Sequence, residues 1–318
     1  MRGESSMEDI KLIEDVKASM PESIAAIGYG SGVFRQKGYA ENEVPDKDII
    51  LVVDDFGNFL SEDFEMHPEH FSDDFDKRVL NKKRKRYYDN LGCLKFYKDN
   101  IHYKVMVISK KALEHDLTTW SHFGMAGRLT KPILYNTASL PGELDSLIHQ
   151  NRTNALITAL LFNTSDKIDR KDLYRTISKM TYMYDFRTIL PGEKKTKSDD
   201  IVEGAIDWFD SYYLYNEILS ENPIMDIDGN TFINKHPIEL IDRLPNSLSN
   251  YIKRKLKVSS SEELSKKDID IISKIINNYL FRTNLINSIR LAIASSSTLG
   301  PKETIKHGLQ KFQKHLKK

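Results

Sequence analysis

The stretch from residue 25 to residue 55, AAIGYGSGVFRQKGYAENEVPDKDIILVVDD, contains the pattern that decides the fold of this chain. Its apolar start and end predict two strands, and a Gly-Tyr-Gly-Ser-Gly turn follows the first. Glycine lets such a turn bring backbone N–H groups close to phosphates. Asp46 and Asp48 open the second strand, and their i, i+2 spacing places both side chains on one face. Paired carboxylates suit magnesium that also contacts a nucleotide triphosphate, so the stretch predicts nucleotidyl transfer.

Composition narrows the class of partner. The 318 residues leave room for two or three domains, and a hydrophobic share of 40% is enough for ordinary cores. Lys and Arg number 47 against 46 Asp and Glu, which gives a net charge of +1. This balance, without an aromatic and basic stripe, argues against a nucleic-acid partner. The single cysteine, Cys93, excludes an internal disulfide and fits a reducing compartment.

The chain carries no obvious targeting or spanning segment. Its first residues, MRGESSMEDIKL, lack the apolar core of a secretory signal and do not resemble a transit peptide. No run of 18 or more apolar residues is present. We therefore expect a cytoplasmic protein that is soluble or peripherally attached to a membrane.

Hydrophobic periodicity predicts an α+β chain whose two halves differ. The first half is α/β: it alternates strands with helices, including a helix capped by Ser109 and another within 62–80 that starts near Pro68. The second half is predicted to be essentially all-α, with a helix capped by Asp169. Boundaries are expected near residue 140 and, more weakly, near residue 258. The predicted strands lie at 24–27, 48–53, 94–97, 102–108 and 131–135, and later helices at 200–219, 237–257 and 266–294.

The glycine-serine turn followed by Asp-Lys-Asp-Ile and an apolar strand resembles the DNA polymerase β-like nucleotidyltransferase superfamily. In that resemblance Ser31 and the turn amides hold the triphosphate, and the two aspartates hold magnesium. A third carboxylate usually joins such a site from a later strand. Here that strand offers Lys104, so either the third acid is missing or Asp99 supplies it. Lys104 is predicted to contact phosphate, against the alternative of a solvated strand lysine.

Further blocks follow in one order and narrow the resemblance. The chain is similar to the mitochondrial-type phosphatidate cytidylyltransferases, the translocator assembly and maintenance family, over nearly its whole length. The family joins CTP to phosphatidic acid with magnesium and releases pyrophosphate. The resemblance implies a nucleotidyltransferase domain at 1–140, a helical, winged-helix-like domain at 141–258 and a C-terminal helical region at 259–318. The blocks are YGSGVFRQ (29–36), PDKDIILVVDD (45–55), HFS (70–72), KVMVIS (104–109), AGRLTKP (126–132) and DFR (185–187).

Residue by residue, the resemblance implies Gly30 and Ser31 at the CTP phosphates, with Tyr29 in the same binding set, and Asp48 at the metal. Asp46 departs from the pattern, because eukaryotic members carry an apolar residue there. Asp46 is therefore expected as an additional metal ligand that needs a test. Tyr184 replaces the family's glycine before the DFR block, which leaves the backbone near that block undetermined.

Two pairs of residues are candidate phosphate contacts. Arg128 is suited to bind phosphate bidentately, with a structural salt bridge as the alternative, and Lys131 either assists it or is solvated. Asp185 and Arg187 lie in the second half. Arg187 is predicted to clamp a phosphate across a cleft between the halves, and a mutual Asp185–Arg187 pair is the alternative.

The C-terminus predicts a membrane contact. After Pro301, apolar residues recur at helical spacing among six lysines, which indicates a basic amphipathic helix suited to an anionic surface. The alternative is a terminal helix docked on the protein's own core. The basic run at 82–86 is either a second contact or a solvated loop. We expect reversible peripheral attachment, on the matrix side of the mitochondrial inner membrane if this is a processed eukaryotic form, and a homo-oligomer is possible.

The sequence thus favours a CTP:phosphatidate cytidylyltransferase that uses Mg²⁺, with Asp48, Asp46 and Lys104 as catalytic residues. The lipid phosphate attacks the α-phosphate of CTP in line. One alternative is a nucleotidyltransferase that acts on a non-lipid substrate. The other is a non-catalytic module that binds nucleotide or membrane, which the missing third acid suggests.

Overall fold

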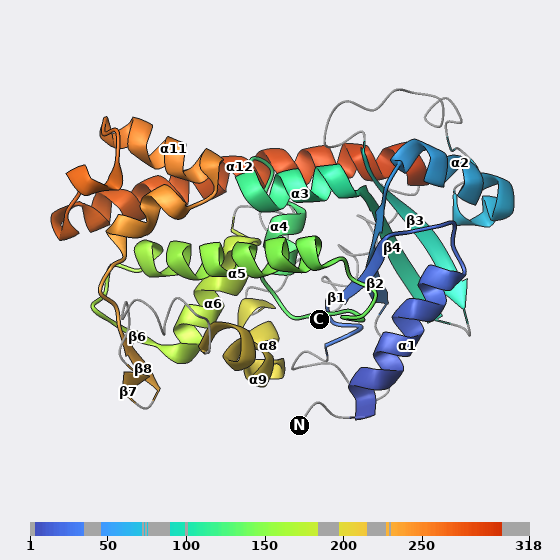
Figure 1. Ribbon diagram of the computed structural model, residues 1–318, viewed down its shortest axis with the longest axis horizontal. Helices are drawn as coiled ribbons and strands as arrows, with labels where there is room; N and C mark the ends of the chain where they lie inside the picture. Colours follow the sequence, from blue (N-terminus) through green and yellow to red (C-terminus); the bar gives the residue numbers. More distant parts are fainter. Residues whose placement is uncertain are drawn as a thin grey trace, which may run out of the picture.

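The computed structural model describes residues 4–34, 46–71, 73, 75, 90–98, 101–183, 197–214, 227–228 and 230–300. Within these ranges the chain has an α+β fold with a mixed five-stranded sheet at one end and helices over the rest (Figure 1). The strands are β1 (Ala25–Tyr29), β2 (Lys47–Val53), β3 (Leu91–Lys98), β4 (Ile101–Ser109), β5 (Ile133–Leu134), β6 (Lys167–Asp169), β7 (Ile227–Asp228) and β8 (Thr231–Ile233).

The α-helices of the described residues are α1 (Glu4–Ala18), α2 (Phe56–Met66), α3 (Lys110–Thr119), α4 (Met125–Leu129), α5 (Gly142–Phe162), α6 (Arg170–Met180), α8 (Lys197–Gly204), α9 (Ile206–Phe209), α11 (Asn246–Leu256) and α12 (Ile269–Leu299). Single turns of 3-10 helix occur at Pro68–His70, Ser261–Glu263 and Lys266–Asp268, a longer 3-10 stretch at Ile238–Arg243, and a π-helical turn at Asp210–Leu214.

The five-stranded sheet has the order β3-β4-β2-β1-β5. β2 and β4 run parallel, whereas the other neighbours are antiparallel. From Ile49 to Val53 every side chain of β2 is buried, as expected for a strand in the centre of a sheet that is covered on both faces. The predictions of strands at 24–27, 48–53, 94–97 and 102–108 are confirmed, and the strand predicted at 131–135 is the short β5.

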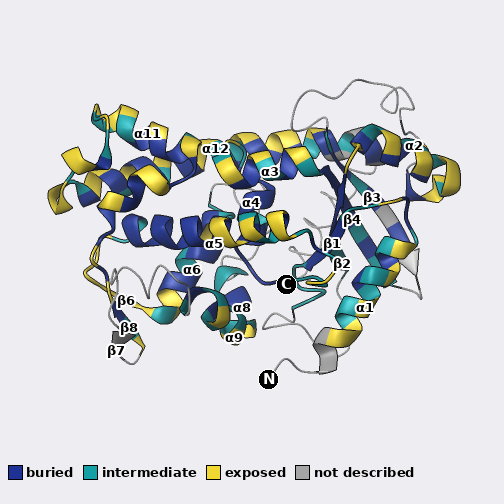
Figure 2. Cartoon of the chain, in the orientation of Figure 1, coloured by how far each residue is buried: buried dark blue, intermediate teal, exposed yellow. Residues whose placement is uncertain are grey.

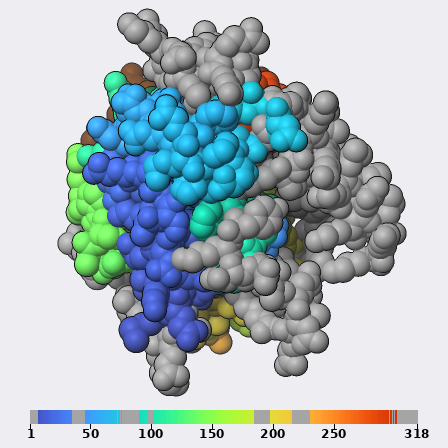
Figure 3. Space-filling model, turned by 90° about the vertical axis from the view of Figure 1, so that its right-hand side faces the viewer, coloured from blue at the N-terminus to red at the C-terminus, as the bar shows by residue number. Residues whose placement is uncertain are grey.

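Different elements cover the two faces of the sheet. Alternate residues such as Ile49 and Leu51 pack with α1 and α2 in one apolar cluster. Ile50 and Val52 point the other way, into a larger cluster that continues through α3, α5 and α12 to Leu291. Figure 3 shows α1 and α2 next to each other on the end face of the molecule. The two halves of the chain therefore share one core across the second face.

The helix α5 lies at the centre of the helical layer. It packs against α3, α4, α6 and α12, and from residue 151 to residue 161 every side chain is buried (Figure 2). The mainly apolar run 155–161 accounts for part of this burial, whereas residues 151–154 are polar and are buried by the surrounding elements. α5 is thus the helix around which α3, α4, α6 and α12 are arranged.

The prediction of an essentially all-α second half is wrong. β6, β8 and β7 form a three-stranded antiparallel sheet there. Each strand has only two or three residues, too few to show an alternating pattern in the sequence. Its pairing depends on the tertiary contact that brings residues 167–169 next to residues 231–233.

Helix ends were predicted with mixed success. Ser109 accepts a hydrogen bond from the Ala112 N–H (3.3 Å) and Asp169 accepts one from the Lys171 N–H (2.8 Å), so both predicted caps are confirmed. The helix within 62–80 was placed too late, because α2 begins at Phe56. Its N-cap is Asp55, whose carboxylate accepts the Gly57 and Asn58 N–H groups.

Some predictions concern residues outside the described ranges. Among these are the basic run at 82–86, Asp99 and the amphipathic helix at 301–318. Among the described helices, none combines the length and hydrophobicity that a membrane crossing requires. The domain boundaries near 140 and 258 stay predictions.

Candidate active site

The turn after β1 is shaped by two glycines. Gly30 has a φ of +77°, a left-handed conformation that glycine adopts without strain, and its carbonyl accepts the Phe34 N–H at 2.9 Å. A Cβ added to Gly32 would lie 2.4 Å from the carbonyl oxygen of Asp46. The turn that contains Ser31 therefore lies directly on the backbone at the start of β2.

This close packing brings Asp48 to the turn. Asp48 pairs with Tyr29 across the antiparallel β1–β2 ladder, and Tyr29 is the residue immediately before Gly30. A Cβ on Gly30 would lie 2.8 Å from the Asp48 Oδ2 atom. The structure thus places the turn suited to phosphates and a carboxylate suited to a metal in contact with each other.

Lys104 completes a charged group on the neighbouring strand. It is the parallel-register partner of Asp48, and its Nζ donates a hydrogen bond to Asp46 Oδ2. The Nδ1 of His102 lies 3.2 Å from the other oxygen, Asp46 Oδ1. The hydrogen bonds from His102 and Lys104 hold the pKa of Asp46 below its usual range despite partial burial. Asp46 is therefore ionised at neutral pH, and both its oxygens already have cationic or polar partners.

These side chains face the helical layer of the molecule. Asp48 alternates in phase with Ile50, and Lys104 with Met106, so all four point to the sheet face that α4 and α5 cover. The Tyr29 hydroxyl donates to the Met106 sulfur at 3.2 Å, which confirms this orientation for β1. The site lies at the edge of the interface between the sheet and the helices.

Arg128 reaches this site from α4. Its guanidinium hydrogen-bonds to the Tyr29 hydroxyl, and it also donates to the Gly124 carbonyl at 2.7 Å. Burial raises the pKa of Tyr29 well above its usual value, and the nearby Asp48 charge adds to the shift. No ion pair links Arg128 to a carboxylate in the described part of the chain. The salt bridge considered as its alternative role is absent there.

A buried network fixes the AGRLTKP block that carries Arg128 and Lys131. The Asp116 carboxylate accepts the Met125 and Ala126 N–H groups at 2.7 and 3.0 Å, which caps α4. Asn151 of α5 donates to the Ala126 carbonyl (2.9 Å), and the Tyr213 hydroxyl donates to the Thr130 carbonyl (2.6 Å). Burial raises the pKa of Asp116 in spite of its backbone partners. The position of Arg128 is thus set by contacts from α3, α5 and the turn at 210–214.

Lys131 is not the solvated lysine that its alternative role required. Its side chain is buried, with 7% of the residue exposed, and its ammonium lies 4.1 Å from the centre of the Tyr182 ring. The ammonium of Lys197, at the start of α8, lies 4.5 Å from the centre of the same ring. Tyr182 and Lys197 come from the second half of the chain and were not among the predicted site residues.

Two other features lie outside this site. His67, Glu69 and His70 approach one another with ligand atoms within 4.8 Å. Each histidine already contacts a carboxylate, His67 that of Glu69 (3.3 Å) and His70 that of the buried Asp63 (3.0 Å).

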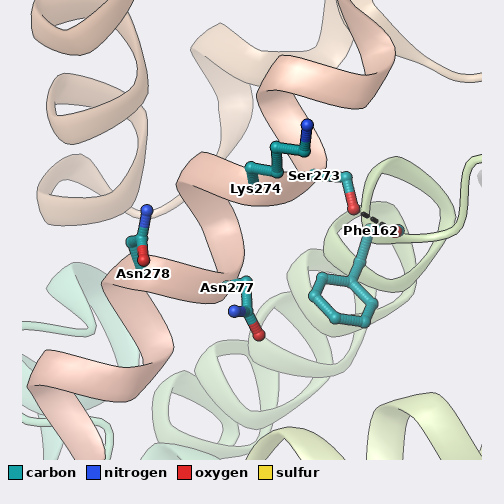
Figure 4. Close-up of a pocket in the computed structure, with 5 residues that line it drawn as sticks. All are labelled: Phe162, Ser273, Lys274, Asn277 and Asn278. Atoms are coloured by element: carbon teal, nitrogen blue, oxygen red, sulfur yellow. Dashed lines mark hydrogen bonds between the residues drawn. The ribbon is translucent and has the colours of Figure 1, made fainter.

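A hollow between α5 and α12 is lined by Phe162, Ser273, Lys274, Asn277 and Asn278 (Figure 4). The Ser273 hydroxyl donates a hydrogen bond there to the Phe162 carbonyl. None of the predicted site residues lines this hollow.

The structure thus brings most of the predicted residues together. Asp185 and Arg187 lie outside the described residues. Sequence reasoning missed His102, Asp116 and Tyr182, and it named Lys197 only as part of a loop that either closes over substrate or is a plain surface loop. Only His102 had a local signal, because its i, i+2 spacing from Lys104 places both on one face of β4. The described members of the predicted set are Tyr29, Gly30, Ser31, Asp46, Asp48, Lys104, Arg128 and Lys131.

Comparison with known proteins identifies the family of this chain. A sequence model of the family described as "Phosphatidate cytidylyltransferase, mitochondrial" matches residues 12–314. The chain belongs to this family. The predicted membership in the mitochondrial-type phosphatidate cytidylyltransferases is confirmed.

Relatives with the same description come from several eukaryotes. The protein from Schizosaccharomyces pombe is 33% identical over 197 residues, which cover 59% of this chain and 48% of the relative. The protein from Xenopus laevis is 33% identical over 212 residues, 64% of this chain and 61% of the relative. The protein from Saccharomyces cerevisiae is 29% identical over 236 residues, 69% of this chain and 58% of the relative. The chain thus spans roughly half to three-fifths of these phosphatidate cytidylyltransferases.

A solved nucleotidyltransferase-like protein from Exiguobacterium sibiricum matches 91% of this chain and 77% of its own, at 11% identity and a TM-score of 0.27. A TM-score this low carries no argument about fold or function.

Proposed function

We propose that this chain is a CTP:phosphatidate cytidylyltransferase that forms CDP-diacylglycerol and pyrophosphate. The proposal also includes a DNA polymerase β-like arrangement for the sheet domain. Family membership supports the substrates, and the site geometry supports the reaction type. The contact between Gly30 and Asp48 carries the proposal, because it joins a phosphate-binding turn to a metal-binding carboxylate.

The donor set at the site fits Mg²⁺. Asp48 offers a hard oxygen ligand next to the turn, and Asp46 offers a second, two residues earlier and just before β2 begins. Both Asp46 oxygens are engaged by His102 and Lys104, so metal binding there requires one of these contacts to yield. Asp48 is therefore the principal proposed ligand, and Asp46 the additional one. When bound, Mg²⁺ supplies charge neutralisation for the triphosphate.

The protein's own groups orient and neutralise the nucleotide. Ser31 and the N–H groups of its turn bind the triphosphate, and Gly30 permits the close approach. Lys104 pairs with Asp48 in the β2–β4 register, and Arg128 of α4, like Asp48, lies near the Tyr29 hydroxyl. Both cations are proposed to contact phosphate oxygens. Arg187, from outside the described residues, is proposed as a further phosphate contact beside Asp185.

The attacking group is the phosphate monoester of phosphatidic acid. Its second pKa lies near 6, as for other phosphate monoesters, so it is largely dianionic at neutral pH. Attack on the α-phosphate of CTP forms the new P–O bond as the bond to pyrophosphate breaks. Because the nucleophile is already ionised, the reaction needs no general base, and the positive groups stabilise the transition state.

The lipid substrate requires access to a membrane. We propose peripheral attachment to an anionic surface through the basic segment 301–318, with the run at 82–86 as a second contact. The names of the relatives support a mitochondrial location for a eukaryotic form. The matrix side of the inner membrane is proposed for that form, and the cytoplasm for a bacterial one. A nucleotidyltransferase domain at 1–140, a winged-helix-like domain at 141–258 and a homo-oligomer belong to the same proposal.

The test is direct synthesis. Purified protein, Mg²⁺, labelled CTP and phosphatidic acid in mixed micelles should yield labelled CDP-diacylglycerol. Omission of phosphatidic acid, and replacement of CTP by ATP, GTP or UTP, serve as controls. Turnover that ignores phosphatidic acid would indicate a different nucleotidyltransferase, and CTP binding without turnover would indicate a non-catalytic module.

A further inference from the structure

The second half of the chain adds two groups to the cationic side of the site. Lys131 follows α4, Tyr182 follows α6, and Lys197 begins α8. The two ammonium groups lie 4.1 and 4.5 Å from the centre of one tyrosine ring. Arg128 stands close enough to act on the Lys131 charge. Two ammonium groups thus converge on a single aromatic side chain, and Arg128 adds a third positive charge near Lys131.

The contact between α4 and α6 explains how Tyr182 reaches Lys131. A Cβ on Gly127 would lie 2.9 Å from the Thr181 Cγ2 atom, so only glycine admits this approach without a shift. The Thr181 hydroxyl donates to the Gly127 carbonyl at 2.9 Å. The residue after Thr181 is therefore held against the AGRLTKP block.

Lys197 is positioned by the packing of α8 on α6. Arg175 of α6 lies 2.7 Å from the Asp199 carboxylate and 3.9 Å from that of Glu203. It also binds Asp172 on its own helix at 2.7 Å. These ion pairs fix the first turn of α8 relative to α6, which places Lys197 over Tyr182.

The surroundings of Lys131 favour a negative ligand if its ammonium is to stay charged. It makes no ion pair with any described carboxylate, and its side chain is buried. Burial lowers the pKa of Lys131, and the charges of Arg128 and Lys197 lower it further, while the Tyr182 side chain partly compensates. A buried ammonium beside two like charges is unfavourable unless a negative group joins it. An aromatic ring attracts cations but supplies only a fraction of a full charge.

We propose that Lys131, Tyr182 and Lys197 form, with Arg128, a subsite for a dianionic phosphate group of a substrate. Three cations match a phosphate dianion better than a single carboxylate, and ammonium groups suit phosphate as point charges. The inference rests on the proposed function for its two sources of phosphate. These are the monoester of phosphatidic acid and the outer phosphates of CTP, which leave as pyrophosphate.

The experiment compares Lys197→Gln and Tyr182→Leu with the control Lys179→Gln. Lys179 is an exposed lysine near the end of α6, the helix that precedes Tyr182. The control therefore loses one positive charge, as Lys197→Gln does, but away from the Tyr182 ring. Calorimetry measures the binding of CTP, of pyrophosphate and of a short-chain, water-soluble phosphatidate to the full chain. Lys197→Arg tests rescue, and thermal unfolding checks that each variant is folded.

We expect Lys197→Gln to weaken one phosphate ligand about tenfold or more, the usual effect of losing a charge-assisted hydrogen bond. If only the binding of phosphatidate weakens, the subsite holds the phosphate of the lipid. If the binding of CTP and pyrophosphate weakens, the subsite holds the outer phosphates of the nucleotide. Lys197→Arg should restore most of the affinity. If Lys197→Gln lowers the unfolding temperature yet binds all three ligands like Lys179→Gln, the contact of the two lysines with Tyr182 is structural. The proposed subsite is then disproved.

These binding measurements need no turnover. If the wild-type protein binds a phosphate ligand through Lys197 but forms no CDP-diacylglycerol, the subsite stands and the proposed reaction fails. If CDP-diacylglycerol forms and binding ignores Lys197, the reaction stands and the subsite fails.

Discussion

The sheet side and the helical side of the site are built in different ways. On the sheet side, Gly30 and Asp48 lie within 18 residues of each other, and hydrogen-bonded strand register joins them. On the helical side, Arg128, Tyr182 and Lys197 come from three helical segments that meet through side-chain packing. The sheet side should therefore tolerate little change, because its backbone forms the proposed phosphate-binding turn and holds Asp48 beside it. The helical side should lose affinity gradually, since several side chains share its charge.

The largest expected effect is at the carboxylate of the sheet side. Asp48→Asn keeps the size of the side chain but removes the charge that holds a metal, so activity should fall at least about 100-fold. Asp54→Asn, an exposed change at the end of the same strand, is the matched control. CDP-diacylglycerol synthesis and Mn²⁺ binding are the measurements. Normal metal binding by a folded Asp48→Asn protein would remove Asp48 from the metal site.

The backbone of the turn comes next. Gly30→Ala forces a side chain into a left-handed conformation, at a cost of about 1–2 kcal/mol of stability. Its Cβ would also lie 2.8 Å from Asp48 Oδ2. Activity should fall by about tenfold to 100-fold, because a displacement of about 1 Å can have an effect of that size.

Gly142→Ala is the matched control for the turn. Its added Cβ meets no atom within 4 Å, and it opens α5. It should leave activity unchanged and stability equal or slightly higher. Equal activity losses in the two variants would show that the turn has no special role.

Asp46→Asn separates metal binding from positioning. Asp46 and Lys104 are each about 40% exposed in their side chains, so their ion pair contributes less than about 1 kcal/mol to stability. Activity should fall by about tenfold, because Lys104 loses a charged partner that orients it. Calorimetry with Mg²⁺ decides the cause. A weaker Mg²⁺ affinity would identify Asp46 as a ligand, and an unchanged affinity would limit it to holding Lys104.

The smallest effect is expected on the helical side. Gly127→Ala places a Cβ 2.9 Å from Thr181 Cγ2, which should reduce stability by about 1–3 kcal/mol through overpacking. The KM of one substrate should rise by less than about tenfold as Tyr182 shifts from Lys131. Thr181→Ser removes the clashing methyl and keeps the hydroxyl, so it should partly rescue Gly127→Ala. Without rescue, the proposed contact between α4 and α6 would not explain the effect.

Local patterns predicted those features that neighbouring residues control. The caps at Ser109 and Asp169 and the strands β1 to β4 follow from residue preferences and periodicity within a few positions. The small sheet β6-β8-β7 did not, because strands of two or three residues contain no periodic signal. Lys131 was open to two readings, since its sequence neighbours do not reveal that Tyr182 covers it.

The sequence by itself determined the family, the glycine-serine turn and the placement of Asp46 and Asp48 at the start of β2, because these depend on local geometry and residue chemistry. The tertiary structure decided which charges meet. It paired Asp46 with Lys104 and His102, buried Lys131, and brought Tyr182 and Lys197 to the AGRLTKP block. The physical reason is that long-range packing, of the kind that Gly127 permits against Thr181, sets distances between side chains that no spacing along the chain encodes.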